Sequence, residues 1–327
     1  MSIPLLQVND LKKYFPVRAG RFGRKAEWVY AVDGVSFDIA RGETLSLVGE
    51  SGCGKSTVGR AILRLFDITA GQVVLDGQRI DDLSANRLRK MRRRMQVVFQ
   101  DPFSSLNPRM RVRDILAEPI RNFSLAKSSA ELDARVVALM DTVRLPREAL
   151  DRRPHEFSGG QRQRIGIARA LAAEPELIVC DEAVSALDVS VKAQIVNLLQ
   201  DLQREFGLAL LFISHDLAIV EHITHRVAVM YLGKIVELAS KRQIFTAPRH
   251  PYTKALLSAV PVPEPGAVRA PMILRGDVPS PINPPRGCRF HTRCPFVFDR
   301  CRSEEPQLRS TASGQWTACH LEALPQG

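Results

Sequence analysis

Residues Gly49 to Ser56, GESGCGKS, have the pattern G-x-x-x-x-G-K-[ST] and follow a short apolar run, GETLSLVG. In this pattern the glycines let backbone N–H groups surround a phosphate, and the start of the following helix adds a positive dipole. We expect Lys55 to reach the β- and γ-phosphates of a nucleotide and the Ser56 hydroxyl to bind Mg²⁺. The pattern also occurs as a chance glycine-rich turn, but here it stands between a predicted strand and a predicted helix.

An acidic pair ends a second apolar run, LIVCDE, from Leu177 to Glu182. A carboxylate at the end of a strand, such as Asp181, can hold Mg²⁺ through water, and Glu182 beside it can act as a general base on an attacking water. Taken alone, such a pair is more often two acidic residues that face solvent. Together with residues 49–56 it predicts a nucleotide-hydrolysing site.

Four shorter features complete the pattern. Gln100 closes the apolar run QVVFQ, Ser158-Gly159-Gly160 opens a long helical stretch, SALD ends at Asp188, and His215 follows LALLFIS. In this order and spacing they resemble the Q-loop, signature motif, D-loop and H-switch of ATP-binding-cassette (ABC) ATPases, over about residues 5–260. The residue after the catalytic glutamate is usually proline in that family, and here Ala183 removes no catalytic group.

The resemblance implies a head-to-tail dimer in which each ATP lies between the phosphate-binding loop of one subunit and the signature motif of the other. It implies that Gln100 senses Mg²⁺ and the attacking water, that His215 contacts the γ-phosphate and that Asp188 lies at the dimer interface. An aromatic ring stacks on adenine in this family; Tyr14 in LKKYFPV fits best, Phe15 is the second candidate, and a core aromatic is the alternative.

The expected site residues follow from these motifs. Expected to bind ATP are Gly49, Glu50, Ser51, Gly52, Cys53, Gly54, Lys55, Ser56, Thr57, Tyr14, Ser158, Gly159, Gly160, Gln161 and Asp188. Expected to take part in catalysis are Glu182, His215, Gln100 and Lys55, with Mg²⁺ held through Ser56, Gln100 and Asp181.

Two longer stretches, VFQDPFSSLNPRM and PRHPYTKALLSAVP, resemble the ATPase subunits of bacterial dipeptide and oligopeptide importers; SPINPPRGC looks most like the F-type subunit of dipeptide permeases. The resemblance implies a second homologous ATPase, two membrane permease subunits, an extracytoplasmic binding protein and a place on the cytoplasmic face of the bacterial inner membrane. A permease subunit is expected to contact Asp101 to Arg109. Sister systems import nickel chelates, glutathione or murein peptides, so the solute stays open.

Composition leaves other function classes to consider. The net charge of +11 and the run RLRKMRRRMQ favour anionic partners, which include nucleic acid. Nucleic-acid relatives carry long inserts or two cassettes, whereas this chain has one, and its arginine run lacks interleaved aromatics. We therefore expect a solvated helix face or a contact with the membrane subunit, and no nucleic acid. A non-enzymatic regulatory subunit would have lost Lys55, Asp181, Glu182 or His215, and all four are present.

Apolar runs that alternate with helical spacing predict the scaffold. A parallel sheet covered on both faces is expected from strands at 42–49, 96–100, 177–182 and 208–214. Two strands about Gly233 and a helix in HPYTKALLSAV should follow. The fold class is α/β: a P-loop ATPase core (1–260) with, by resemblance, an antiparallel β subdomain and a helical subdomain (about 101–173), then a proline-rich linker and cysteine-rich extension (261–327). No apolar run reaches eighteen residues and no signal peptide is recognised, so a cytosolic chain is expected.

Four of the six cysteines, Cys288, Cys294, Cys301 and Cys319, fall in the last forty residues. Their spacing lacks the close pairs of zinc modules, and a proline follows Cys294, so we favour a [4Fe–4S] cluster. Zinc, with His291 or His320 replacing a cysteine, and unligated thiols are the alternatives; a disulfide disagrees with a reducing cytosol. Neighbouring arginines are expected to lower the thiol pKa values.

Overall fold

The computed structural model describes residues 4–17, 27–260, 272 and 274–324. Most of the expected proline-rich linker, residues 261–271 and 273, lies outside the described residues. From residue 274 to residue 285 the chain forms no helix or strand, as its prolines predict.

The core is a sheet whose strands follow the apolar runs of the sequence. Its order is β11-β12-β10-β9-β3-β8-β7-β6. The parallel strands are β3 (Thr44–Val48), β6 (Met95–Val98), β7 (Leu177–Asp181), β8 (Ala209–Ser214) and β9 (Arg226–Tyr231). Every residue of β3, β7 and β8 is buried, because helices and a second sheet cover both faces. The expected parallel sheet is confirmed, and β10 (Lys234–Ser240) pairs antiparallel with β9 across the turn at Gly233.

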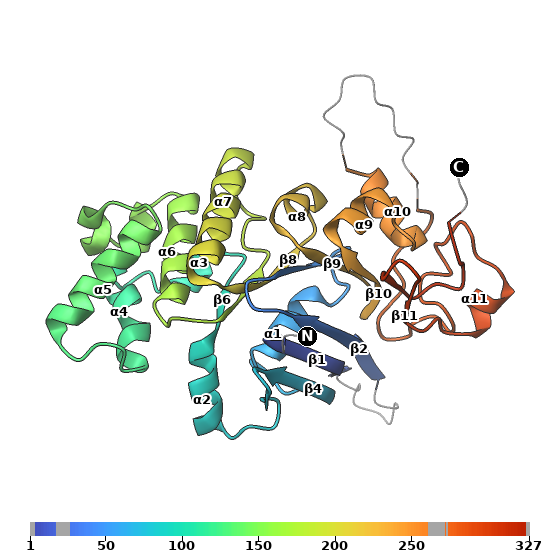
Figure 1. The fold of residues 1–327 in the computed structure, drawn as a ribbon, viewed down its shortest axis with the longest axis horizontal. Helices are drawn as coiled ribbons and strands as arrows, with labels where there is room; N and C mark the ends of the chain where they lie inside the picture. Colours follow the sequence, from blue (N-terminus) through green and yellow to red (C-terminus); the bar gives the residue numbers. More distant parts are fainter. Residues whose placement is uncertain (1–3, 18–26, 261–271, 273, 325–327) are drawn as a thin grey trace.

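A smaller antiparallel sheet, in the order β2-β1-β4-β5, lies below the main sheet in Figure 1. Its strands are β1 (Leu6–Val17), β2 (Glu27–Ile39), β4 (Ala70–Leu75) and β5 (Gln78–Arg79). Helix α1 (Lys55–Ile62) lies between the two sheets, and its Val58, Ala61 and Ile62 are buried in the core that both sheets share. Both sheets therefore fix α1, and with it the loop that precedes it.

The expected helical part is present (Figure 1, left). It comprises α3 (Pro102–Ser105), α4 (Val112–Asn122), α5 (Ser129–Thr142), the 3₁₀ turns η1 (Arg147–Asp151) and η2 (Pro154–Glu156), and α6 (Gly159–Leu171). Ser128 caps α5 by accepting a hydrogen bond from the Glu131 N–H, which explains where that helix begins. The remaining helices of the ATPase core are α2 (Ala85–Arg94), α7 (Val189–Phe206), α8 (Leu217–Ile223), α9 (Lys241–Thr246) and α10 (Pro251–Ser258).

The cysteine-rich extension is joined to the main sheet. It contains α11 (Asp299–Ser303), β11 (Arg309–Ser310) and β12 (Trp316–Thr317), and β12 pairs antiparallel with β10. Phe290 is 1% exposed and belongs to the main core. The extension therefore continues the ATPase sheet and packs into its core, while the domain boundary at residue 260 stays a prediction.

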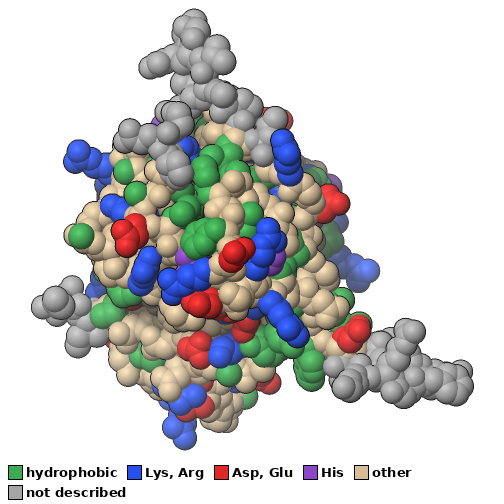
Figure 2. All heavy atoms as spheres, turned by 90° about the vertical axis from the view of Figure 1, so that its right-hand side faces the viewer, with side chains coloured by type: hydrophobic (Ala, Val, Ile, Leu, Met, Phe, Trp, Pro, Cys, Tyr) green, Lys and Arg blue, Asp and Glu red, His purple; other side chains and the backbone are tan. Residues whose placement is uncertain are grey.

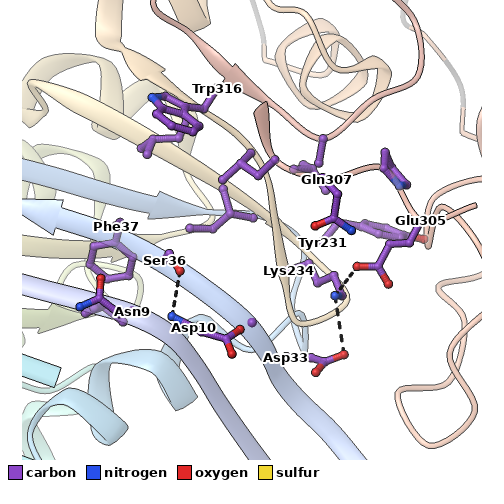
Figure 3. A pocket seen from close by; sticks show the side chains of 18 of the residues that line it. Asn9, Asp10, Asp33, Ser36, Phe37, Tyr231, Lys234, Glu305, Gln307 and Trp316 are labelled. Carbon is purple, nitrogen blue, oxygen red and sulfur yellow. Dashed lines mark hydrogen bonds and ion pairs between the residues drawn. The ribbon is translucent and has the colours of Figure 1, made fainter. Parts of the chain in front are cut away.

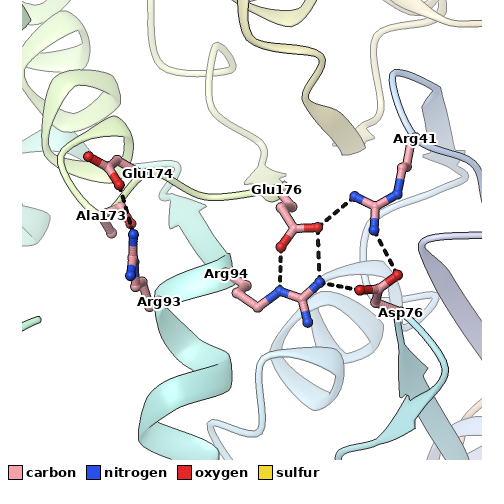
Figure 4. A network of polar contacts seen from close by, with 7 residues as sticks. All are labelled: Arg41, Asp76, Arg93, Arg94, Ala173, Glu174 and Glu176. Carbon is pink, nitrogen blue, oxygen red and sulfur yellow. Dashed lines mark hydrogen bonds and ion pairs between the residues drawn. The ribbon is translucent and has the colours of Figure 1, made fainter.

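The arginine run at the end of α2 is not a fully solvated face. Arg94 and Arg41 alternate with Glu176 and Asp76 in a ring of charges (Figure 4). Arg94 Nη2 lies 2.9 Å from Glu176 and 2.7 Å from Asp76, and Arg41 pairs with the same two carboxylates at 2.6 and 2.7 Å. Arg93 pairs with Glu174 in the same way. Arg93 and Arg94 are thus neutralised within the chain, and these ion pairs join α2 to the residues just before β7 and to the small sheet.

No helix in the described part of the chain is both long enough and apolar enough to cross a membrane.

The ring predicts a pH-dependent contribution of Glu176 to stability. The hydrogen bond from Arg94 holds the pKa of Glu176 below its ordinary 4.5. Its contribution is therefore full above the unfolded-state pKa and is lost as pH falls through the lowered folded-state pKa. Glu176→Gln should lower the free energy of unfolding by about 1–2 kcal/mol at pH 7, and this difference should shrink towards pH 3.

Urea titrations at several pH values measure this difference. Glu221→Gln, which changes an exposed carboxylate on α8, is the control and should have little effect. An unfolding difference for Glu176→Gln that does not change between pH 7 and pH 3 would contradict the ring as described.

Candidate nucleotide-binding site

Residues 49–54 connect β3 to α1 through backbone that needs glycine. Gly49 has a φ of 149°, and a Cβ there would lie 2.2 Å from the Met230 carbonyl oxygen of β9. Gly54 is the N-cap of α1 and has a φ of 106°. The loop can therefore lie against β9 and still present its N–H groups at the start of α1.

Lys55 lies inside this loop. Its side chain is 4% exposed, and its Nζ donates to the carbonyl oxygens of Gly49 at 2.7 Å and Glu50 at 2.9 Å. The Glu50 N–H donates in turn to the Tyr252 hydroxyl of α10 at 2.8 Å. The ammonium group is thus held against the phosphate-binding loop by two of its carbonyl oxygens.

The predicted Mg²⁺ ligands Ser56 and Asp181 lie next to each other. The Ser56 hydroxyl donates to Asp181 Oδ1 at 2.6 Å, across from the start of α1 to the end of β7. Arg60 approaches the other oxygen of Asp181 at 3.5 Å. Gln100, two residues beyond β6, lines a cavity of about 350 Å³ together with Asp181. These oxygen donors are of the kind that Mg²⁺ prefers.

Glu182 and His215 face each other at the ends of β7 and β8. His215 Nδ1 lies 3.6 Å from Glu182 Oε1, and the His215 side chain is 54% exposed. Glu182 has a φ of 51°, and its N–H donates to the Ile213 carbonyl at 3.1 Å, so the backbone turns sharply out of the strand there. The carboxylate is 16% exposed and lies beside Asp181, where a base acting on water would be needed.

The signature residues stand apart from this loop within one chain. Ser158 and Gln161 form a capping box at the start of α6. The Gln161 N–H donates to the Ser158 hydroxyl at 3.3 Å, and the Ser158 N–H donates to Gln161 Oε1 at 3.0 Å. Figure 1 shows α6 in the helical part and α1 near the centre. Among the described residues no hydrogen bond joins residues 158–161 to residues 49–57. Asp188 is the N-cap residue of α7 and is exposed. Unlike Ser158, it makes no side-chain hydrogen bond to the start of its helix.

The predicted adenine-stacking residue, Tyr14, lies half-buried on β1. Its ring packs edge-on against Tyr30 with centroids 4.8 Å apart, and its hydroxyl donates to Asp33. Burial and this hydrogen bond raise the pKa of Tyr14. Phe15, the second candidate, packs edge-on against Phe66 at 5.5 Å.

The four C-terminal cysteines line one small cavity together with His250, His291 and His320. All of the chain's cysteines are free. Among the residues that the structure describes, no group of three or more His, Cys, Asp or Glu side chains is arranged to hold a metal ion. The sequence-based prediction of a [4Fe–4S] cluster, with zinc as the alternative, is therefore not confirmed and stays a prediction.

The expected effect of arginines on these thiols is wrong. Burial raises the pKa of Cys288 to about 12 and that of Cys294 to about 11, and it raises the pKa of Cys319 as well. Burial therefore outweighs the arginine charges, and two of the expected neighbours, Arg289 and Arg293, are paired with Asp33 and Glu50 instead.

Comparison with known proteins agrees with this geometry. Residues 32–185 match the family model described as "ABC transporter", and residues 236–301 match "Oligopeptide/dipeptide transporter, C-terminal region". "Oligopeptide transport ATP-binding protein AppF" of Bacillus subtilis is 53% identical, over 97% of this chain and 97% of its own. The chain belongs to the ABC transporter ATP-binding proteins.

Other relatives of this ABC ATPase agree. The "Probable peptide ABC transporter ATP-binding protein y4tS" of Sinorhizobium fredii is 55% identical over 99% of this chain and 91% of its own. Among solved structures, CbiO1 from Clostridium perfringens has a TM-score of 0.64 at 26% identity and covers 75% of this chain and 91% of its own. The ATP-binding cassette MJ0796, solved as a dimer bound to ADP and Pi, has a TM-score of 0.63 at 28% identity. The match covers 72% of this chain and 99% of that chain. The chain is an ATPase whose chemistry is hydrolysis of ATP to ADP and phosphate.

Two contacts of Glu50 were not foreseen from the sequence. Tyr252 stands in PYTKALL, a stretch expected to form a helix but not to contact the loop, and its hydroxyl accepts a hydrogen bond from the Glu50 N–H. Arg293 reaches the Glu50 carboxylate from the cysteine-rich extension. Tyr252 and Arg293 lie 202 and 243 residues from Glu50 in the sequence, and no local sequence pattern predicts a contact over such a separation.

Packing at α6 gives a stability prediction with an internal control. A Cβ on Gly160 would lie 2.4 Å from Val191 Cγ1 of α7, whereas a Cβ on Gly166 would meet no atom within 4 Å. Gly160→Ala should lower the free energy of unfolding by about 1–3 kcal/mol. Gly166→Ala should raise it by up to about 1 kcal/mol, because alanine favours helix. Urea unfolding measures both changes, and equal stabilisation by the two would contradict the predicted clash.

Proposed function

We propose that this ABC ATPase energises the import of dipeptides or oligopeptides across the cytoplasmic membrane. The observation that carries the proposal is the C-terminal match at 236–301, whose α10 supplies Tyr252 to the phosphate-binding loop. The relatives named above are oligopeptide and peptide transport proteins, which supports the same solute class.

We propose the following roles in hydrolysis. Lys55 binds the β- and γ-phosphates, with the loop amides around it. Ser56 and Asp181, which are hydrogen-bonded at 2.6 Å, would hold Mg²⁺ with Gln100; when bound, the ion would supply positive charge beside the phosphates. Glu182 accepts a proton from the attacking water, and His215, 3.6 Å away, contacts the γ-phosphate.

On this proposal the site is completed by a second, homologous ATPase. Ser158 to Gln161 form an exposed helix start without a lysine of its own, which suits the γ-phosphate of an ATP bound to another subunit. Asp188 would lie at the dimer interface, and the ring of Tyr14 would stack on the adenine. The separation of α1 from α6 within the chain supports this arrangement (Figure 1).

Residues 101–109 are the proposed contact with one of two membrane permease subunits. Phe103 is 63% exposed, and the Arg162 guanidinium of α6 stacks 3.5 Å from its ring centroid. Arg169 of the same helix donates to the Ser105 carbonyl. A movement of this segment would therefore reach the signature helix directly. An extracytoplasmic binding protein would act through the permease, with this chain on the cytoplasmic face of the inner membrane.

Nickel chelate, glutathione or murein peptide import would use the same machinery, so these remain alternative solutes. A nucleic-acid role is less favoured, because the arginines at the end of α2 are paired within the chain. The face of the C-terminal extension also carries acidic and basic side chains side by side (Figure 2).

One experiment tests both hydrolysis and solute. The chain is assembled with the proposed permease subunits and second ATPase, and ATP turnover is measured with the binding protein loaded with a dipeptide. We expect peptide to stimulate turnover and Glu182→Gln to lower it by a factor of about 10² or more, because it removes the base. Glu205→Gln, an exposed carboxylate on α7, is the control.

Each other outcome has a defined meaning. Unchanged turnover in Glu182→Gln would show that the partner ATPase carries catalysis alone. If a nickel chelate or a murein peptide stimulated turnover and a dipeptide did not, that compound would replace the dipeptide as the proposed solute. DNA-stimulated turnover without membrane subunits would overturn the proposal.

We further propose that Cys288, Cys294, Cys301 and Cys319 hold a [4Fe–4S] cluster, with zinc as the alternative. The support is their convergence on one cavity although 31 residues separate the first from the last. Four thiolates are the usual ligands of such a cluster, which would fold a segment that has little core of its own.

Anaerobic purification tests the cluster. We expect a brown protein with iron and acid-labile sulfide in equal amounts, and loss of both in Cys294→Ser. Cys180→Ala, which alters a buried cysteine of β7, should keep them. Zinc without sulfide would favour the alternative, and a colourless protein free of both metals would leave four unligated thiols.

A further inference from the structure

Two arginines of the cysteine-rich extension turn away from the cysteines and towards the nucleotide site. Arg293, next to Cys294, forms a two-pronged contact with the Glu50 carboxylate: Nη1 donates to Oε2 at 2.7 Å and Nη2 to Oε1 at 3.1 Å. The Arg293 side chain is 8% exposed and that of Glu50 29%. A bidentate guanidinium–carboxylate pair with this little exposure is short, directional and weakly screened.

Arg289 reaches the other end of the same loop through one intermediate turn. Its Nη1 donates to the Leu232 carbonyl at 2.6 Å. The next N–H, that of Gly233, donates to the Cys53 carbonyl at 2.9 Å. The extension therefore touches the loop at Glu50 directly and at Cys53 through the β9–β10 turn.

A layer of aromatic rings keeps these arginines in place. Phe290, between the two arginines in sequence, packs against Tyr231, Tyr252 and His250 with ring centroids 5.2, 5.4 and 5.6 Å apart. Tyr252 is also the residue whose hydroxyl accepts the Glu50 N–H. One aromatic cluster thus lies beside Arg293 in the sequence, through Phe290, and also holds the backbone of its partner Glu50, through Tyr252.

The rest of the extension lies across a hollow from the small sheet. A cavity of about 740 Å³ is lined by residues of β1 and β2 on one side and of the extension on the other (Figure 3). Lys234 reaches across it by pairing with Glu305 and, at 3.8 Å, with Asp33. Arg289 and Phe290 also line this cavity, whereas Arg293 and Glu50 do not, so their ion pair connects the extension to the nucleotide site directly.

We propose that Arg293 is a positioning residue for ATP: it fixes Glu50, and with it the entrance of the phosphate-binding loop. Glu50 is then held at its side chain by Arg293, at its N–H by Tyr252 and at its carbonyl by Lys55. A loop ordered in advance binds phosphate without the entropy cost of ordering it on binding. The role requires only ATP binding, so it is independent of the transported solute and of any metal at the cysteines.

The proposal predicts a change in KM for ATP rather than in kcat. In the assembled transporter, Arg293→Gln should raise KM about tenfold, which corresponds to about 1.4 kcal/mol, and should leave kcat within about twofold. Glu182 and His215 are untouched, which is why turnover at saturating ATP should persist. Arg293→Lys should restore part of the affinity, because it keeps the charge but loses the two-pronged geometry. Arg300→Gln is the control, since that exposed arginine pairs with Glu304 of its own extension.

A double-mutant cycle with Glu50→Gln separates positioning from general damage. We expect the double variant to have a KM no higher than that of Arg293→Gln alone, because both changes remove one interaction. Direct titration of the full chain with a fluorescent ATP analogue, beside melting temperatures, keeps the test valid if the assembled complex is inactive. An unchanged KM for Arg293→Gln would overturn the proposal, as would KM increases that multiply in the double variant, or a loss of kcat that merely follows a lowered melting temperature without rescue by lysine.

Discussion

The structure depends on one constraint: a glycine-rich loop must present its N–H groups to phosphate and still keep one conformation. Glycine at positions 49 and 54 allows the shape but cannot maintain it, because glycine backbone is the least restricted. The shape is maintained from outside, by the Met230 carbonyl of β9, the β9–β10 turn and the Tyr252 hydroxyl. Arg293 adds a contact from the last forty residues. The nucleotide site is thus built by segments from both ends of the chain.

Because the loop is held partly by Arg293, the extension is an integral part of the ATPase fold and not a separate appended segment. Strand β12 continues the main sheet beyond β10, and Phe290 joins the core beneath the loop. The other half of the ATP chemistry, at the start of α6, lies in the helical part, where Arg162 stacks on the exposed Phe103. On the proposed mechanism, closure of two chains would bring the two halves together, and the segment around Phe103 would carry that movement to the permease.

The parts of the fold that sequence predicts are those governed by local pattern. The apolar run ending at Gly49 and the run ending in Asp181 and Glu182 predicted two strands and the edge of the sheet at which they end, because buried parallel strands need apolar residues along their whole length. Long-range pairing left no such pattern. Arg94 belongs to a run expected to face solvent or to contact the membrane subunit, yet Glu176, 82 residues away in the sequence, neutralises its charge. Arg289 and Arg293 were expected to act on thiols, but nearby carboxylates bind them more strongly than a buried neutral thiol can.

The central claim is that the phosphate-binding loop is held in place by its neighbours before ATP arrives. Amide hydrogen exchange at Glu50, measured on the full chain without nucleotide, tests this most directly, because that N–H is bonded to Tyr252 at 2.8 Å. The account predicts slow exchange in the wild-type chain and clearly faster exchange in Tyr252→Phe. Exchange at Glu50 as rapid as in an unstructured peptide, in the otherwise folded wild-type chain, would contradict it.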